Sequence, residues 1–481
     1  MANSKIHSKI DVLIIGGGFS GTMLAVQLLR RRRSLSIAVL DRGSLPGRGL
    51  AYSSPHRFHL LNVPAGQMSA FPADPEDFLR WAKSNYVASM QARSFPPRAL
   101  YGEYLGSVLD RTLAESGRDA FRWIQDEALS LQRRRGKLAV QRKNMDSSEL
   151  LARTVVLATG NFPPATPRIP GLQPASARGS SLYVQFAWAS SALENLPREG
   201  SVLLLGSGLT SVDMIMALKS KAFQGIIHIL SREGLVPSRH QQTKTKPWPL
   251  FWNDRSPRTT RGLLRLIRDQ VEAASDEGVD WRSVVDSLRP VTQQIWQSLP
   301  PNERRRFLRH ARAYWDIHRH RLAPEIADIF SDMEAEGQIR FHTGRITRYT
   351  EDRNLAEIVY QERGATMEKR LHAHRVINCT GSETDCRRID DSLITSLFVQ
   401  GLARPDPLFL GLDVDRNGAL IDYQGRPSLS LFTIGPTRKA HLWETTAVPE
   451  IRQQAEQLAL HLLKVLHSHE QDQDDLLEPA V

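Results

Sequence analysis

Residues 11–21 read DVLIIGGGFSG, and the rest of the chain is organised around this stretch. Its branched apolar residues, 12–15, have the pattern of a buried parallel strand, and an Ala- and Leu-rich helix is predicted to follow to about Arg31. A second apolar strand, residues 37–40, ends at Asp41. Strand, G-x-G-x-x-G, helix and strand in this order predict a βαβ unit that binds the pyrophosphate of a dinucleotide.

Each position of the glycine motif has its own expected task. Gly16 makes the tight turn, Gly18 lets the backbone approach the pyrophosphate, and Gly21 lets helix and strand pack closely. The helix start offers unpaired N–H groups to the phosphates, and the acid that ends the second strand accepts hydrogen bonds from the ribose. The residues predicted to contact this first dinucleotide are Gly16, Gly18, Phe19, Ser20, Gly21, Asp41 and Arg42.

Length and composition predict a multidomain protein of the globular class. A chain of 481 residues is too long for one ordinary core, and 41% hydrophobic with 24% charged residues is typical of soluble proteins. The polar residues 1–9 do not resemble a signal peptide, and no apolar run has the length of a bilayer span. Two cysteines, Cys379 and Cys386, form neither a disulfide framework nor a zinc set. We therefore expect a cytoplasmic protein without a membrane or metal site.

The formal net charge of +11 at pH 7 raises the question of a nucleic-acid partner. The basic residues are mostly scattered arginines, and no nucleic-acid-binding motif accompanies them. A basic protein that holds anionic nucleotides and an anionic substrate is the simpler explanation. Nucleic acid is therefore not an expected partner.

Two further segments are predicted to lie beside the first dinucleotide. Residues 43–73 form a long, irregular, Gly- and Pro-rich loop, and such loops in nucleotide-binding domains are usually functional. Residues 154–160 read as a buried strand that ends in Ala-Thr-Gly, whose small side chains permit close passage over a cofactor. For Asn62, a cofactor contact and a plain turn before Pro64 both remain open. The candidate residues are Ala51, Tyr52, Asn62, Val63, Thr159 and Gly160.

A second βαβ unit begins at residue 202. The strand 202–205 leads into Gly206-Ser207-Gly208-Leu209-Thr210-Ser211, a helix, and a second strand that ends at Ser231-Arg232. Arg and a hydroxyl at this point suit a ribose 2′-phosphate, which favours NADPH over NADH, although Glu233 lies nearby. The candidate residues for this second dinucleotide are Gly206, Gly208, Thr210, Ser211, Ser231 and Arg232.

Residues 234–330 interrupt the alternation of strands and helices with an Arg-rich, helical insertion. Such a layer beside a cofactor domain is a natural lid or substrate wall. Arg319 and Arg321 are candidates for binding an anionic substrate, because guanidinium groups pair well with planar anions. Either is equally suited to a structural ion pair with Asp316 or Glu325.

The C-terminal third returns to strands before a last helix. Strands are expected near 339–341, 346–349 and 358–361, and residues 376–381 repeat the strand ending in Thr-Gly. A buried strand at 431–436 precedes the segment 443–450, which is predicted to start the final helix, with Thr before Pro as a cap and N-terminal turn. This helix start would face a flavin. Acidic residues after His467 predict a disordered tail. The candidate cofactor contacts here are Gly435, Trp443 and Thr446.

Taken together, these segments resemble the FAD/NAD(P)-binding flavoproteins that include FAD-dependent urate hydroxylases and aspartate N-oxidising flavin monooxygenases. Where many related flavoproteins end a strand in Gly-Asp over the FAD ribitol, this chain has Gly435-Pro436. The motifs that carry the resemblance are Gly16-x-Gly18-x-x-Gly21, Gly49-x-Ala51-Tyr52, Leu61-Asn62-Val63-Pro64, Pro97-Arg98-x-x-Tyr101-Gly102, Gly206-Ser207-Gly208-Leu209-Thr210-Ser211-x-Asp213, Tyr314-Trp315-Asp316-x-His318-Arg319-His320-Arg321 and Trp443-Glu444-Thr445.

The resemblance implies an α/β fold with two dinucleotide-binding, Rossmann-like domains. The FAD domain is expected to be split into residues 1–161 and 381–481, and the NAD(P) domain to span 162–380 with the insertion at 234–330. It also implies FAD and NADPH as cofactors, with NADH as an alternative.

The expected activity is that of a FAD-dependent, NAD(P)H-oxidising monooxygenase. It would use O₂ to hydroxylate a small, anionic, nitrogen-containing metabolite that is urate-like or amino-acid-like. The alternatives are a flavin reductase that passes electrons to a partner protein and a non-catalytic FAD-binding protein. A disulfide reductase ranks low because Cys379 and Cys386 have the wrong spacing and context. No catalytic side chain is predicted, because the flavin carries the difficult chemistry. The substrate's identity and the oligomeric state stay open.

Overall fold

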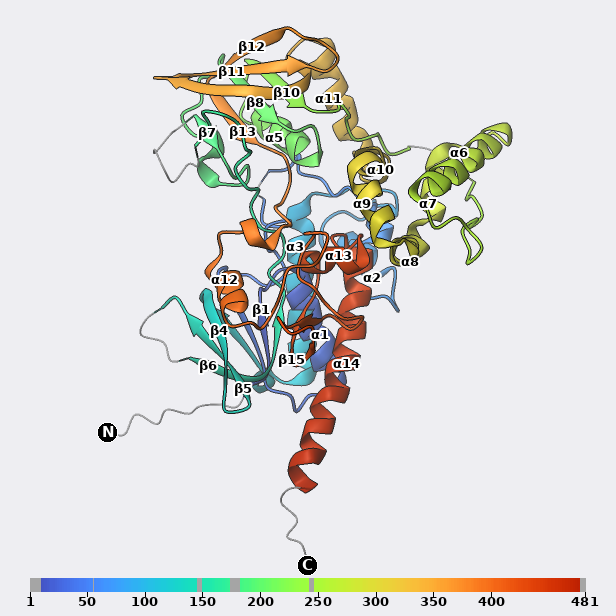
Figure 1. Cartoon of the computed structure of the whole chain (residues 1–481). Coiled ribbons are helices and arrows are strands. Elements are labelled where there is room, and N and C mark those ends of the chain that lie inside the picture. Colours follow the sequence, from blue (N-terminus) through green and yellow to red (C-terminus); the bar gives the residue numbers. More distant parts are fainter. Residues whose placement is uncertain (1–9, 55, 145–148, 174–181, 242–245, 476–481) are drawn as a thin grey trace, which may run out of the picture. The chain divides into compact units, whose positions relative to one another are not determined.

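The computed structural model describes residues 10–54, 56–144, 149–173, 182–241 and 246–475 (Figure 1). Backbone contacts divide the chain into two compact units. Unit 1 comprises residues 1–55, 64–162 and 384–481, and unit 2 comprises residues 56–63 and 163–383. The first unit is therefore assembled from segments that lie on both sides of the second in sequence.

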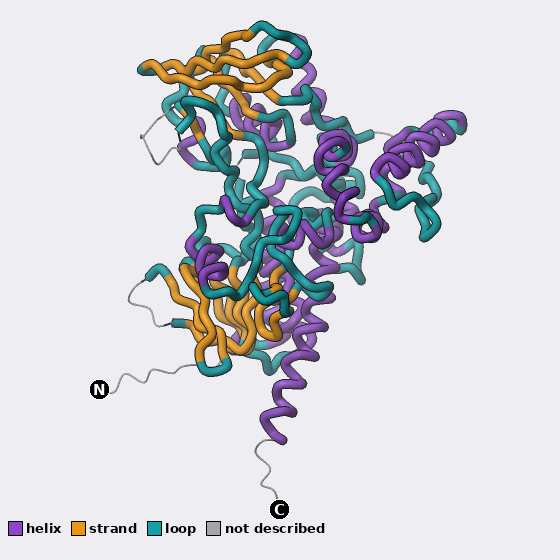
Figure 2. Tube along the Cα trace, in the orientation of Figure 1, coloured by secondary structure: helices purple, strands orange, loops and turns teal. Residues whose placement is uncertain are grey.

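Unit 1 is built on a sheet with the strand order β14-β15-β6-β1-β2-β3, to which the hairpin β4–β5 is joined through β6. Figure 2 draws the strands in orange and the helices in purple. Strands β15, β6, β1, β2 and β3 run parallel. Its strands are β1 (Ile10–Ile15), β2 (Ile37–Asp41), β3 (Phe121–Gln125), β4 (Ala128–Arg134), β5 (Lys137–Arg142), β6 (Leu150–Leu157), β14 (Ala419–Ile421) and β15 (Pro427–Thr433). Its α-helices are α1 (Phe19–Arg31), α2 (Asp77–Asn85), α3 (Arg98–Ser116), α12 (Ser392–Val399), α13 (Lys439–Leu442) and α14 (Val448–Asp475).

Burial on both faces explains why the strand at the centre of this sheet is apolar throughout. Leu13 and Ile15 of β1 belong to one core cluster together with Ile394 and Leu397 of α12. Helix α1 packs between α3 and α14, and the three run along the sheet in Figure 1. Each residue of β1 is buried, as expected for a parallel strand covered by helices on both sides.

Unit 2 contains a second sheet with the order β12-β11-β10-β9-β8-β13-β7. Strands β10, β9, β8, β13 and β7 are parallel, and β11 and β12 extend the sheet as an antiparallel meander. The strands are β7 (Tyr183–Val184), β8 (Ser201–Leu205), β9 (Ile226–Ser231), β10 (Ile339–Asp352), β11 (Leu355–Glu362), β12 (Glu368–Ala373) and β13 (Arg375–Asn378). The α-helices are α5 (Leu209–Ser220), α6 (Thr260–Asp276), α7 (Trp281–Ser287), α8 (Thr292–Ser298), α9 (Pro301–His310), α10 (Arg312–Arg319) and α11 (Pro324–Ala335).

The two parallel sheets share the arrangement of their central strands. Unit 1 orders its parallel strands β3-β2-β1-β6-β15, and unit 2 orders them β10-β9-β8-β13-β7. The strand that precedes the glycine-rich turn, β1 in unit 1 and β8 in unit 2, lies at the centre, so the strand order reverses beside that turn. The outermost strand differs, because β15 is the last strand of unit 1 in the chain and β7 is the first of unit 2. Such a reversal opens a crevice at the carboxyl ends of the strands, where α/β sheets of this kind bind nucleotides.

Two local predictions were wrong in detail. The strands expected near 339–341 and 346–349 are one strand, β10, with an irregular register between Ile346 and Arg348. The tail expected to be disordered after His467 continues α14 to Asp475. The last helix begins at Val448, inside the segment 443–450 that was predicted to start it, and Trp443, with a φ of 61°, ends the short helix α13. Residues 1–9 and 476–481 lie outside the described part.

The predicted insertion also contains a helix that belongs to the core topology. Helix α11, from Pro324, packs against β10 and contacts α5, so it is the crossover between β9 and β10. Helices α6 to α10 form the inserted layer proper. Within the described residues, no helix combines the length and the apolar character needed to cross a membrane.

Candidate functional site

The glycine-rich turn of unit 1 has a geometry that only glycine accommodates. Gly16 has a φ of 107°, and a Cβ there would lie 2.2 Å from the carbonyl oxygen of Ala158. A Cβ on Gly21 would lie 1.9 Å from the carbonyl oxygen of Gly16. These contacts bring α1, β1 and the end of β6 together, which is the close packing expected from the motif.

The start of α1 leaves donors available for an anion. The N-cap residue, Gly18, has no side chain to cap the helix, and a Cβ there would meet only the Cα of Gly49, at 3.5 Å. At the end of β6, Thr159 has a buried hydroxyl without a hydrogen-bond partner, and Gly160 has a φ of 70° with open space around it. An unpaired hydroxyl beside free helix amides fits a phosphate group.

The Asp41 side chain stabilises the glycine-rich turn through hydrogen bonds to backbone amides. One carboxylate oxygen accepts a hydrogen bond from the amide of Gly17 at 2.6 Å, and the other accepts one from Gly43 at 2.6 Å. A carboxylate has about four acceptor positions, so two remain for ribose hydroxyls. The neighbouring Arg42 is exposed and pairs with Glu127 at 2.9 Å and Asp391 at 3.3 Å.

Two side chains that brace this turn were missed by the sequence reasoning. The Thr22 hydroxyl donates to the carbonyl of Gly17 at 2.9 Å and accepts from the amide of Gly47 at 3.0 Å. Trp123 of β3 packs so closely on Gly17 that a Cβ there would lie 2.0 Å from its ring. Trp123 lies on β3, 80 residues after Gly43 in the chain, and no local sequence pattern signals a contact over that separation.

The structure brings some of the other predicted cofactor-binding residues of unit 1 close to one another. Ala51 is exposed, whereas the half-buried ring of Tyr52 lies 4.8 Å from that of Tyr101. A Cβ on Gly435 would lie 2.7 Å from the hydroxyl of Ser20, so these two predicted residues are neighbours across the start of α1. Phe19 at the same helix start is buried.

The loop after β15 is held by its own hydrogen bonds. The carbonyl of Gly435 accepts from the Thr445 hydroxyl at 2.8 Å, and its amide donates to Gln454 of α14 at 3.2 Å. Trp443 is buried, and Thr446 is exposed immediately before α14. Thr446 is therefore accessible to a ligand, while Trp443 and Val448, the first residue of α14, are part of the protein core.

Unit 2 repeats the glycine-rich turn. Gly206 also has a φ of 107°, and a Cβ there would lie 2.8 Å from the carbonyl oxygen of Cys379. The third motif position is Ser211, whose hydroxyl donates to the carbonyl of Gly206 at 2.6 Å. Gly208 is exposed, caps α5 without a side chain, and has open space where a Cβ would point. Thr210 lies half-buried in the first turn of α5.

At the end of β9, the charges favour an additional phosphate. Arg232 is exposed, and the Ser231 hydroxyl accepts from the amide of Gly234 at 3.0 Å. Glu233, which would repel a phosphate, forms an ion pair with Arg363. The acid's charge is thus balanced, and the guanidinium of Arg232 remains beside the strand end.

Asn62 and Val63 lie with unit 2, although they were predicted within the first FAD-domain segment. The ring of His240 donates to the carbonyl of Asn62 at 3.0 Å, and the ring of His59 donates to the carbonyl of Asp213 at 2.8 Å. Burial lowers the pKa of His240 to about 4, so the ring is neutral at pH 7. The amide side chain of Asn62 is half-buried, and its cofactor role stays a prediction.

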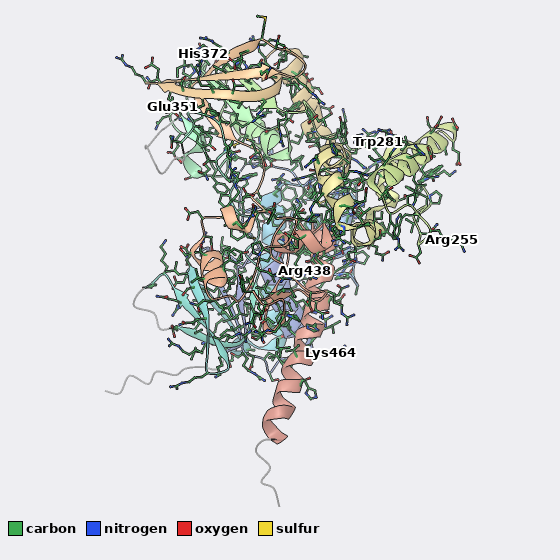
Figure 3. All side chains as sticks on the ribbon, in the orientation of Figure 1. Arg255, Trp281, Glu351, His372, Arg438 and Lys464 are labelled. Atoms are coloured by element: carbon green, nitrogen blue, oxygen red, sulfur yellow. The ribbon has the colours of Figure 1, made fainter. Side chains whose placement is uncertain are left out.

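The two arginines predicted to bind substrate differ in their surroundings. The buried guanidinium of Arg321 makes two 3.0 Å hydrogen bonds to Asp286, and its Nε donates to the carbonyl of His318 at 2.7 Å. It also lies over the ring of Trp281, which begins α7 and is marked in Figure 3. This bidentate pair favours the structural alternative for Arg321, with Asp286 as its partner instead of Asp316 or Glu325. Arg319 is buried at the end of α10.

Replacing Arg321 by Ala should therefore lower stability more than substrate affinity. Loss of two hydrogen bonds to a carboxylate should lower the free energy of unfolding by about 2 kcal/mol, since the partner is half-exposed. Urea unfolding of Arg321→Ala, Asp286→Ala and the double variant measures the interaction free energy between the two side chains. Unchanged stability combined with weaker substrate binding would instead assign Arg321 to the substrate.

Neither cysteine is suited to thiol chemistry. Cys379 is buried at the end of β13, and burial raises the pKa of its thiol to about 12. Cys386 is also buried. A thiol with such a pKa is protonated at neutral pH and is a poor nucleophile, which argues against a disulfide reductase.

The fold and the paired glycine turns define a chain with two dinucleotide-binding units. Residues 13–162 match a family model described as FAD-NAD(P)-binding. An L-aspartate N-monooxygenase (nitrosuccinate-forming) from Streptomyces davaonensis is 26% identical over 309 residues, which cover 56% of this chain and 45% of the relative. The match thus spans less than half of that relative's length. The predicted resemblance to FAD/NAD(P)-binding flavoproteins is confirmed by these matches.

Solved structures confirm the predicted fold class. The FAD-bound cadaverine monooxygenase of Erwinia amylovora has a TM-score of 0.64 at 15% identity, over 96% of this chain and 95% of that one. The reduced ornithine hydroxylase of Pseudomonas aeruginosa has a TM-score of 0.62 at 16% identity, over 95% of this chain and all of that one. At such identities the likeness establishes the fold only.

Proposed function

We propose that the chain is a FAD-dependent monooxygenase that oxidises NADPH and uses O₂ to hydroxylate the nitrogen of a small, carboxylate-bearing amino compound. The observation that carries the proposal is the pair of glycine turns. Gly16 and Gly206 have the same φ of 107°, and each follows the central strand of a parallel sheet, β1 or β8. Two such turns in one chain suit one dinucleotide that is a resident cofactor and another that is a reductant.

The residues of unit 1 fit FAD. The uncapped start of α1 and the unpaired hydroxyl of Thr159 can donate to the pyrophosphate, and Asp41 has acceptor positions left for the ribose. FAD, when bound, supplies the redox and oxygen chemistry. The protein's part is then to bind, to orient and to exclude water, which agrees with the lack of a predicted catalytic side chain.

The residues of unit 2 fit NADPH better than NADH. Replacing Arg232 by Ala should weaken NADPH binding by about 10- to 100-fold, the range expected for losing a charge-assisted hydrogen bond, with little effect on NADH. Titration of both nucleotides against the variant measures this. Arg370→Ala is a matched control, because Arg370 is a basic side chain of β12 in the same unit that pairs with Glu357. An equal loss for both nucleotides would remove the 2′-phosphate assignment.

An amino acid is the preferred substrate class within this proposal. Support comes from the aspartate-oxidising relative, although it is similar over only 56% of this chain. A urate-like substrate and a cytoplasmic location stay predictions. The basic insertion remains compatible with a carboxylate-bearing substrate, even with Arg321 engaged by Asp286.

Anaerobic mixing with NADPH tests whether the protein is an enzyme at all. The proposal expects the yellow, FAD-loaded protein to bleach as the flavin accepts a hydride. A flavin that stays oxidised under NADPH, with or without amino acids, would indicate a non-catalytic FAD-binding protein. Rapid NADPH oxidation that requires an added protein acceptor would indicate an electron-transfer reductase instead.

A further inference from the structure

A chain of redox-active aromatic side chains runs through unit 1. The ring of Tyr52 lies 4.8 Å from that of Tyr101, and Tyr101 lies 5.4 Å from Tyr104. Tyr104 in turn lies 5.5 Å from Trp81 of α2, which is half-buried. We refer to Tyr52, Tyr101, Tyr104 and Trp81 as the aromatic chain. Adjacent rings at these separations are close enough for an electron to pass from one to the next.

Tyr101 and Tyr104, the two fully buried tyrosines of the aromatic chain, differ in the hydrogen bonding of their hydroxyl groups. The Tyr104 hydroxyl donates to Oδ2 of Asp77 at 2.5 Å and accepts from the amide of Ala70 at 3.1 Å. The Tyr101 hydroxyl is buried without a hydrogen-bond partner. Both rings have no exposed surface, so burial is matched and only the hydrogen bonding differs.

This difference decides which tyrosine can be oxidised. A phenol that loses an electron becomes a strong acid, and a stable neutral radical forms only if a base takes its proton. Asp77 is nearly buried, and its carboxylate faces Arg111 at 3.3 Å and Arg80 at 3.8 Å. Oδ2 of Asp77 already holds the hydrogen bond from the Tyr104 hydroxyl, so this oxygen lies where the phenol proton would move.

We propose that Tyr104 is a redox-active tyrosine, with Asp77 as its proton acceptor and Trp81 as the link to the surface. A one-electron oxidant of the radical class takes an electron from the aromatic chain. The O–H bond of Tyr104 breaks, its proton moves to Asp77, and the products are a neutral tyrosyl radical, a carboxylic acid and the reduced oxidant. A thiol-class reductant that reaches Trp81 returns the electron, becomes a thiyl radical and releases its own proton to solvent, and the proton held by Asp77 returns to Tyr104. The arrangement moves oxidising equivalents out of the core.

The resting state keeps the proton on the phenol. Burial raises the pKa of Tyr104 far above its usual value, and the charge and hydrogen bond of Asp77 raise this pKa further. Proton transfer to Asp77 therefore requires removal of an electron first. Burial also raises the pKa of Tyr101, but its hydroxyl has no hydrogen-bond partner to take the proton, so an oxidised Tyr101 takes an electron from a neighbouring ring instead of forming a stable neutral radical.

The experiment compares Tyr104→Phe with Tyr101→Phe, two substitutions that each remove one buried hydroxyl. Purified full-length protein is oxidised by flash-generated tris(bipyridine)ruthenium(III) and examined by freeze-quench electron paramagnetic resonance. The background carries Phe in place of the exposed Tyr86, Tyr314 and Tyr423, which the oxidant reaches directly. We expect a tyrosyl signal that persists in Tyr101→Phe. In Tyr104→Phe it should fall by about tenfold or more, because the phenol that holds the radical is gone and the Tyr101 hydroxyl has no hydrogen-bond partner to take its proton.

Asp77→Asn tests the proton acceptor separately. Asn can accept the hydrogen bond but is not a base, so the radical yield should again fall by about tenfold, and the solvent deuterium isotope effect on radical formation should disappear. Thermal unfolding checks that each variant is folded. If Tyr104→Phe does not fold, the comparison of Asp77→Asn with Tyr101→Phe decides. Equal signals in wild type and Tyr104→Phe, equal losses in the two Tyr→Phe variants, or an unchanged signal in Asp77→Asn would each overturn the proposal.

Discussion

Gly18→Trp is expected to yield folded but colourless protein. Gly18 has a φ of −69°, which any residue adopts, and a Cβ there would make an ordinary contact with Gly49. The indole would nevertheless occupy the place of the pyrophosphate at the start of α1. The affinity for FAD should fall by at least about 100-fold, equivalent to about 2.7 kcal/mol. Visible absorption after dialysis against excess FAD measures this loss.

Gly106→Trp serves as the matched control for this substitution. Gly106 lies on α3 of the same unit, and a Cβ there meets nothing within 4 Å. This variant should remain yellow, because its indole lies away from the glycine turn. A Gly18→Trp protein that binds FAD as tightly as the control would show that α1 does not receive the cofactor.

Gly208→Trp is expected to separate the two nucleotide sites. A Cβ on Gly208 meets nothing within 4 Å, and the residue has a φ of −82°, so the fold should tolerate the change. The indole would cover the start of α5, where the second pyrophosphate is expected. The rate of flavin reduction at a given NADPH concentration should fall by at least about 100-fold, while the FAD content stays that of the wild type.

Stopped-flow mixing without oxygen measures that rate. Reduction by dithionite provides the control, because a small chemical reductant does not need the second site and should bleach the flavin at the wild-type rate. Loss of FAD from Gly208→Trp, or an unchanged rate with NADPH, would contradict the assignment of unit 2 as the NADPH-binding unit.

The two βαβ units could be predicted because their signals are local. Each unit places an apolar strand, a glycine turn and an apolar helix within about thirty residues, and each residue type has one steric reason for its position. The value of 107° for both Gly16 and Gly206 agrees with the tight turn that the spacing predicted. Even the replacement of the third glycine by Ser211 was compatible with this turn, since its hydroxyl bonds to Gly206.

Contacts between distant residues could not be predicted in the same way. Arg321 pairs with Asp286, 35 residues earlier, whereas local spacing offered only Asp316 and Glu325 as partners. The carbonyl of Asn62 is held by His240, 178 residues later, so its segment lies with unit 2. Such pairs depend on how helices and loops pack in the folded chain. The local sequence pattern of either segment does not indicate which distant residue is its partner.

The measurement that tests the central proposal most directly is a screen of amino acids, purines and small carboxylates. For each compound, NADPH oxidation and the mass of the product are followed in the presence of O₂. We expect at least one amino acid to accelerate NADPH oxidation and to gain one oxygen atom on its nitrogen, with the oxygen derived from ¹⁸O₂. If every compound that accelerates NADPH oxidation yields only hydrogen peroxide, the proposed monooxygenase activity is wrong.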